Sequence, residues 1–253
     1  MESKNQRWTD SQLKLAFYLY CLLPFGKLHS RNPHIKEMAK IIGRTPNALA
    51  MKLVNFASLD PAIRSTGRKG LGNSSKSDKE IWDLFHHNWF KLTVECELYL
   101  QKNNFSSISD NLSAKSSFVG ETRDTITKTR IGQNFFRKSV LASYEGVCCM
   151  SGVSISELLV ASHIIPWSQS KENRLNPSNG LCLSAIHDRA FDKGLISIDA
   201  NYNIIVSNRI KSLSSIPQLS ILAKLNGKLI TMPKRFYPEK EFLSWHNNNV
   251  FIK

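Results

Sequence analysis

The stretch from Ala161 to Gly194, ASHIIPWSQSKENRLNPSNGLCLSAIHDRAFDKG, constrains the fold of this chain more than any other. An apolar run up to His163 predicts a strand, which Pro166 must end because proline cannot donate to a sheet ladder. After a loop, Asn179-Gly180 leads into a second short strand, LCLS, and AIHDRAFDKG predicts a helix stopped by Gly194. Strand, loop, strand and helix therefore carry a His, an Asn and a His-Asp pair in that order.

The rest of the C-terminal half alternates between helical and extended patterns. Its hydrophobic periodicity predicts helices at 132–146, 216–225 and 239–251, short strands at 147–152, 157–165 and 228–232, and a hairpin at 195–207. We therefore expect an α+β C-terminal domain.

The N-terminal half reads as helical throughout. Thr9 is a good N-cap for a helix in residues 10–23, and Thr45 with Pro46 begins another after a short glycine-containing turn. The helix pair in residues 34–59 has the outline of a helix-turn-helix unit, although a small bundle with a solvated polar face fits it too. Ser77 and Glu80 form a capping-box pair for a further helix up to residue 102.

The second helix of this pair would read DNA. Candidate groove contacts on it and just before it are Arg44, Asn47, Lys52 and Asn55. The basic loop that follows offers Arg68 and Lys69 to phosphates, or is a plain flexible loop.

The segment 103–129 is rich in Ser and Thr and weakly apolar, which is typical of a linker or an irregular arm. We expect an all-α, helix-turn-helix-like DNA-recognition domain at residues 1–102 and a second domain at residues 130–253.

The charge balance points to a polyanionic partner. The chain has 34 Lys and Arg against 20 Asp and Glu, a formal net charge of +14, and nucleic acid is the first candidate. No run of eighteen apolar residues predicts a membrane span and no signal-peptide pattern opens the chain, so we expect a cytoplasmic protein without membrane contact. The five cysteines include no C-x-x-C pair, and no structural zinc is expected.

The motif order of 161–194 resembles that of HNH endonucleases, also called ββα-metal nucleases. With the preceding FRKSVLASYEGVCCMSG and the trailing GKLITMPKRFYPEKEFLSWHNNNVF, the C-terminal half is similar to HNH enzymes of the restriction type. The N-terminal half resembles the DNA-binding part found with such nucleases. The resemblance implies a ββα-metal nuclease domain and endodeoxyribonuclease activity.

Hydrolysis of a phosphodiester needs a base, a cation and fixed geometry, and the residues of this stretch fit these roles. His163 is the candidate general base, and the resemblance implies that Asn179 braces the loop that orients it. The family pattern places the metal ligand at Asp188, with His187 one position earlier as the alternative. Asp188 suits Mg²⁺, whereas His187 would favour Mn²⁺, Ni²⁺ or Zn²⁺. Asp192, one turn further on, supports the metal or makes a structural hydrogen bond.

One position departs from the family pattern. Many HNH nucleases carry an Asp directly before the catalytic His, and here that position is Ser162. The metal is then held by fewer protein ligands, a ligand comes from elsewhere in the chain, or the domain is inactive. Lys171 and Arg174 in the loop are candidate phosphate contacts, and a solvated loop would explain them equally well.

The sequence thus predicts a Mg²⁺-dependent restriction-type endonuclease acting on double-stranded DNA. Its target would be a base sequence or a DNA modification, and cutting both strands favours a homodimer. The alternatives are a DNA-binding regulator with an inactive HNH domain and a homing-type nuclease.

Overall fold

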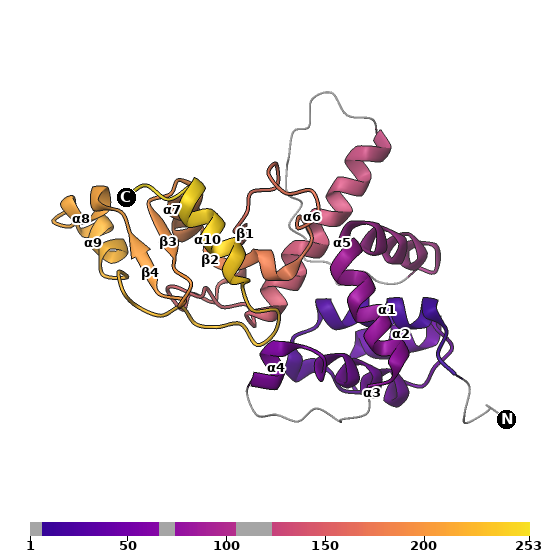
Figure 1. The fold of residues 1–253 in the computed structure, drawn as a ribbon. Helices are drawn as coiled ribbons and strands as arrows, with labels where there is room; N and C mark the ends of the chain where they lie inside the picture. The colour runs from indigo at the N-terminus through magenta and orange to yellow at the C-terminus, as the bar shows by residue number, and fades with distance from the viewer. Residues whose placement is uncertain (1–6, 66–73, 105–122) are drawn as a thin grey trace. The chain divides into compact units, whose positions relative to one another are not determined.

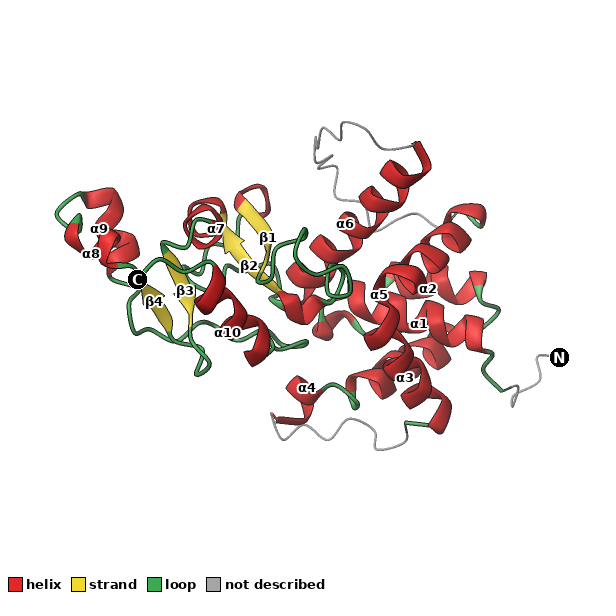
Figure 2. Ribbon diagram, turned by 45° about the horizontal axis from the view of Figure 1, so that its top comes forward, coloured by secondary structure: helices red, strands yellow, loops and turns green. Residues whose placement is uncertain are grey.

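The computed structural model describes residues 7–65, 74–104 and 123–253, and it has the expected α+β organisation (Figures 1 and 2). The chain divides into two compact units, Met1–Phe135 and Phe136–Lys253, called the N-terminal and C-terminal units below. The division falls inside α6 (Arg123–Ser143). Most of the linker expected at 103–129 lies outside the described residues, but 123–129 are helical as the first turns of α6.

The described part of the N-terminal unit is built from helices alone (Figure 2). They are α1 (Asp10–Leu22), η1 (Phe25–Lys27), α2 (Pro33–Ile41), α3 (Pro46–Ala57), α4 (Pro61–Ser65), α5 (Lys76–Lys102) and the first part of α6. Thr9 and Thr45 cap α1 and α3 as predicted. The core is aromatic, since the Phe17 ring of α1 lies 5.1 Å from that of Phe56 and 4.7 Å from that of Phe85.

The start of α5 differs from the prediction. The helix begins at Lys76, and the capping box is made by Ser75 and Asp78 instead of Ser77 and Glu80. Asp78 is fully buried, and its carboxylate both accepts from the Ser75 backbone N–H and meets the Lys52 ammonium at 2.8 and 3.1 Å.

This ion pair also corrects the expectation for Lys52. Its side chain is buried between α3 and α5 and does not face a DNA groove. Because removing one partner of such a pair leaves a buried charge uncompensated, Lys52 is a structural residue of this unit.

The C-terminal unit contains two antiparallel strand pairs covered by helices (Figure 1). β1 (Leu159–His163) pairs with β2 (Gly180–Ser184), and β3 (Ile196–Ile198) pairs with β4 (Ile204–Val206), the latter confirming the expected hairpin. The other elements are η2 (Ser156–Leu158), η3 (Pro177–Asn179), α7 (Ala185–Asp192), α8 (Asn208–Ser212), α9 (Pro217–Ala223) and α10 (Lys240–Asn249). α7 packs on β1, β2 and β3, and α10 packs on β3.

Two expected strands are not formed. Residues 147–152 make a turn in which the Cys149 N–H donates to the Cys182 carbonyl, and Leu229 of 228–232 makes a single bridge to Asn203. Each segment pairs with its neighbour over too few residues to form a regular strand, so apolar content alone misled the prediction. Among the described residues, no helix is long and apolar enough to cross a membrane.

A buried histidine ties α10 to the rest of the C-terminal unit. The His246 ring stacks on Phe191 with centroids 3.8 Å apart, and its Nε2 lies 3.2 Å from the Phe191 carbonyl oxygen. Its Nδ1 lies 2.7 Å from the Ser197 hydroxyl of β3. Burial lowers the pKa of His246 to about 4, although the hydrogen bond to Phe191 opposes this shift.

The C-terminal unit should therefore lose stability in mild acid. The unfolded chain binds a proton at this histidine below about pH 6.5, whereas the folded chain does so only near pH 4. Between these values the free energy of unfolding falls with decreasing pH, by about 1.4 kcal/mol per pH unit for one histidine. Urea unfolding at a series of pH values should show this slope in the wild type and a smaller slope in His246→Gln. An unchanged slope in that variant would contradict the assignment, and the exposed His29, replaced by Gln, is the control.

Candidate active site

The candidate site is built on β1, β2 and α7, with α6 on one side of the hairpin. His163 is the last residue of β1 and pairs with Gly180, the first residue of β2. Because side chains alternate along a strand, Ser162 and His163 point to opposite faces. Ser162 lies by Asp188 of α7, and His163 lies against Phe136 of α6.

The imidazole of His163 is held on three sides. Its ring stacks on Phe136 with centroids 3.7 Å apart and meets the edge of Trp167 at 5.6 Å. Its Nε2 lies 2.9 Å from the backbone carbonyl oxygen of Arg174. Since a carbonyl oxygen can only accept, Nε2 carries the proton and Nδ1 of the neutral ring keeps its lone pair.

The surroundings of His163 also keep it neutral. Its pKa is lowered to about 4, chiefly by burial. The hydrogen bond to the Arg174 carbonyl opposes this shift, and the charge of the Arg174 side chain adds to it. Near neutral pH the ring is therefore in the form that accepts a proton.

Asn179 joins the two ends of the loop between β1 and β2. Its Oδ1 accepts from the Ile165 N–H at 2.8 Å, and its Nδ2 donates to the carbonyls of Ile165 and Asn173, each at 3.1 Å. The side chain is fully buried. Its three hydrogen bonds fix the loop that supplies the Arg174 carbonyl to His163.

The Gly180 that follows is required by packing. A Cβ at this position would lie 2.3 Å from Cγ2 of Val140 and 3.0 Å from the Phe136 ring. Glycine therefore lets α6 approach β2 closely enough for Phe136 to stack on His163. Neither Phe136 nor Trp167 could be assigned to the site from the sequence, because aromatic residues beside a strand fit an ordinary core equally well.

His187 and Asp188 occupy different environments on α7. The side chain of His187 is buried; its Nδ1 lies 2.6 Å from the Ser184 hydroxyl, and its Nε2 is buried without a hydrogen-bond partner. Burial lowers the pKa of His187. Asp188 is half-buried beside the Ser162 hydroxyl; burial raises its pKa, and Ser162 and the charge of Arg189 lower it in part.

Asp192 lies one turn beyond Asp188; the residue is exposed, but its carboxyl is partly shielded from solvent. Burial of its carboxyl and the charge of Asp188 both raise its pKa, so the two carboxylates are close enough to interact. Two carboxylates spaced by four residues share one face of the helix.

The oxygens at this face fit a hard divalent cation. The hydroxyl oxygen of Ser162 is buried, makes no well-formed hydrogen bond, and faces the Asp188 carboxyl. Asp188, Asp192 and Ser162 together offer oxygen donors, the type that Mg²⁺ and Mn²⁺ prefer. No cluster of three His, Cys, Asp or Glu side chains arranged for a metal occurs in residues 7–65, 74–104 and 123–253, so water and substrate would complete the shell.

The residues predicted to contact DNA differ in their exposure and in their hydrogen-bond partners. Arg174 stacks its guanidinium 5.1 Å above the Trp167 ring, and Lys171 is exposed. In the N-terminal unit, Asn47 is exposed and Asn55 is half-buried, whereas Arg44 donates to Gln12 and to the Arg7 carbonyl. Arg68 and Lys69 lie outside the described residues.

Comparison with known proteins gives a match for the segment that holds this site. No curated protein matches the chain. Residues 148–199 match a family model described as HNH endonuclease, and they contain β1, β2 and α7. With its ββα arrangement and the histidine at the end of β1, the segment 148–199 is therefore similar to an HNH endonuclease domain.

Proposed function

We propose that this protein is a metal-dependent endonuclease that hydrolyses phosphodiester bonds in double-stranded DNA. The observation that carries the proposal is the hydrogen bond from His163 Nε2 to the Arg174 carbonyl, which leaves Nδ1 as a proton acceptor at the end of β1. A neutral histidine fixed in this way suits a general base.

In the proposed reaction, His163 Nδ1 takes a proton from a water molecule, whose oxygen then attacks the phosphorus. The bond from phosphorus to the 3′ oxygen breaks, the 3′ oxygen takes a proton from solvent, and the products carry a 5′-phosphate and a 3′-hydroxyl. Asn179 holds the loop and thereby the ring of His163 in one orientation. The stacked Phe136 restricts rotation of the ring.

Asp188 is the proposed metal ligand, assisted by Asp192 and the Ser162 hydroxyl. A divalent cation bound there would supply positive charge to stabilise the departing 3′ oxygen. The oxygen donors favour Mg²⁺, with Mn²⁺ as an alternative. His187 is buried and contacts Ser184, which favours a structural role for this residue. Binding of Ni²⁺ by His187 is therefore the less favoured arrangement.

The loop between β1 and β2 would also contact the phosphate. Arg174 donates from Nε to the Trp167 carbonyl at 2.7 Å and stacks on the Trp167 ring, which orients its terminal N–H groups beside His163. These groups suit a phosphate oxygen, and Lys171 adds a second positive charge to the same loop. The formal net charge of +14 supports binding to DNA in general.

The N-terminal unit is proposed to choose the target, as in restriction enzymes, through α2 and α3. Asn47 and Asn55 are the side chains on α3 that remain available for base contacts, and Arg44 just before the helix would approach the backbone. The target would be a base sequence or a modified base. A homodimer would bring two such sites to the two strands.

The test is cleavage of supercoiled plasmid and of genomic DNAs with different base modifications, with Mg²⁺, with Mn²⁺ and with EDTA. We expect linear products in the presence of metal and none with EDTA. Tight, salt-sensitive DNA binding without cleavage under any of these conditions would favour a DNA-binding regulator instead. Equal cleavage of modified and unmodified DNA would remove modification dependence.

A further inference from the structure

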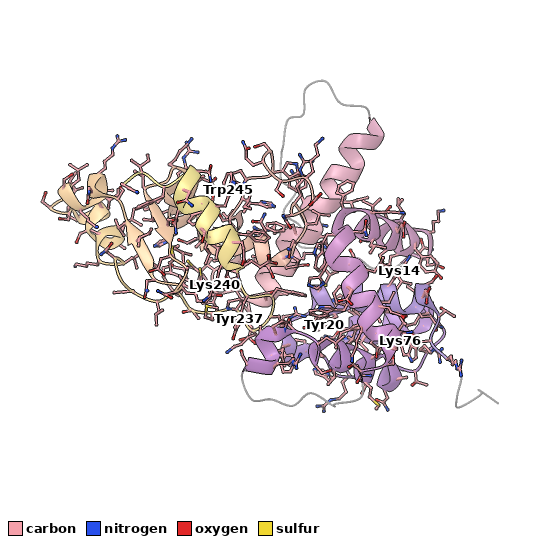
Figure 3. The ribbon with its side chains drawn as sticks, viewed as in Figure 1. Lys14, Tyr20, Lys76, Tyr237, Lys240 and Trp245 are labelled. Carbon is pink, nitrogen blue, oxygen red and sulfur yellow. The ribbon has the colours of Figure 1, made fainter. Side chains whose placement is uncertain are left out.

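We infer that Glu239, outside the HNH match, is a positioning residue for His163, an inference that rests on the proposed function. Glu239 directly precedes α10, whose residues Lys240 and Trp245 are labelled in Figure 3. It lies more than sixty positions from the loop that it contacts, since its partner Asn176 is 63 residues away.

Glu239 holds the turn η3 by two hydrogen bonds. Its Oε1 accepts from Nδ2 of Asn176 at 3.3 Å, and its backbone N–H donates to the Ser178 carbonyl at 3.3 Å. Asn176 is itself the N-cap of η3, because its Oδ1 accepts from the Ser178 N–H at 3.0 Å. The carboxylate therefore fixes the side chain that forms this turn.

The adjoining turn, residues 173–176, carries the carbonyl that orients the base, and Asn176 belongs to both turns. The Asn176 N–H donates to the Asn173 carbonyl at 3.3 Å, and Asn179 Nδ2 donates to that carbonyl at 3.1 Å. Arg174 lies between Asn173 and Asn176, and its carbonyl accepts from His163 Nε2. A turn held by Asn179 alone would be fixed at one end, and Glu239 fixes the other.

The Glu239 side chain has no competing task at its own helix. It is the residue before α10, but its side chain makes no capping hydrogen bond to that helix. It is half-buried, where a carboxylate without a partner would cost free energy. The contact with Asn176 is therefore the interaction that this geometry favours for its carboxylate.

The experiment compares Glu239→Ala, Glu239→Gln and the control Glu241→Ala in the full chain. Gln keeps an oxygen that can accept from Asn176, and Glu241 is an exposed carboxylate on the same helix with no hydrogen bond to the loop. The readouts are kcat and KM for DNA cleavage, and the NMR signal of the His163 Nε2 proton. That proton is protected from solvent exchange only while its bond to the Arg174 carbonyl is held.

For Glu239→Ala we expect kcat to fall about ten- to a hundred-fold with KM unchanged, as for a base displaced by a fraction of an ångström. The Nε2 proton signal should be lost to exchange in the same variant. Glu239→Gln and Glu241→Ala should retain both the rate and the signal.

Three outcomes would overturn the inference: a persistent Nε2 proton signal in Glu239→Ala, a Gln variant as impaired as the Ala variant, or an equal loss in Glu241→Ala. The NMR readout does not depend on activity. If the wild type cuts no DNA but only Glu239→Ala loses the signal, the proposed function fails and the positioning of His163 stands.

Discussion

Replacing His163 with Ala is expected to lower the rate of metal-dependent DNA cleavage by about 10²- to 10⁴-fold, the usual contribution of a general base. DNA affinity should change little, because the ring is held by Phe136, Trp167 and the Arg174 carbonyl instead of reaching out to a phosphate. The measurement is single-turnover cleavage together with DNA binding in EDTA.

Chemical rescue makes this test specific for the base. His163→Ala leaves a space between the Phe136 and Trp167 rings that matches an imidazole molecule. Added imidazole should therefore restore part of the rate in this variant and leave the wild type unchanged. The exposed His29, replaced by Ala, is the matched control. Cleavage by His163→Ala at the wild-type rate would contradict the assigned role.

The ββα frame of the site was accessible from sequence because its signals are local. Three local signals mark it: a strand that ends at His163, a second strand that begins after Asn179-Gly180, and a helix that ends at Gly194. β1, β2 and α7 lie where these signals predict. Gly194 adopts a φ of +65°, which glycine reaches at low cost. The resemblance also indicated that Ser162 stands where many HNH nucleases carry an acid, although not what faces it.

The contacts that could not be predicted join residues far apart in sequence. Lys52 has the spacing of an exposed helix position, and only the fold shows that Asp78 reaches it from α5. Glu239 reads as an ordinary acidic residue before a helix, and its partner Asn176 lies 63 positions away in the sequence. In each case a polar residue is matched by a buried partner that hydrophobic periodicity does not reveal.

The second prediction with a large expected effect concerns which residue, His187 or Asp188, binds the metal. Asp188→Asn is expected to weaken metal binding by at least about a hundred-fold, since loss of a residue that only hydrogen-bonds to a metal ligand already costs ten- to a hundred-fold in affinity. His187→Gln should keep the metal response and lower thermal stability, because it disturbs a buried contact with Ser184. The measurements are Mn²⁺ titration by calorimetry and cleavage rate against Mn²⁺ concentration.

A substitution at Ser162 also tests whether the cation binds at the oxygens of Asp188, Asp192 and Ser162. Ser162→Asp would place a second carboxylate beside that of Asp188, where burial already raises the pKa of the resident acid. Without metal, two close carboxylates repel each other, so the melting temperature of Ser162→Asp should fall below that of the wild type. Added Mn²⁺ should raise it again by more than in the wild type, because metal binding to the folded state stabilises it. If His187→Gln abolishes the Mn²⁺ response and Ser162→Asp leaves it unaltered, the cation binds at His187 and the oxygen face of α7 is structural.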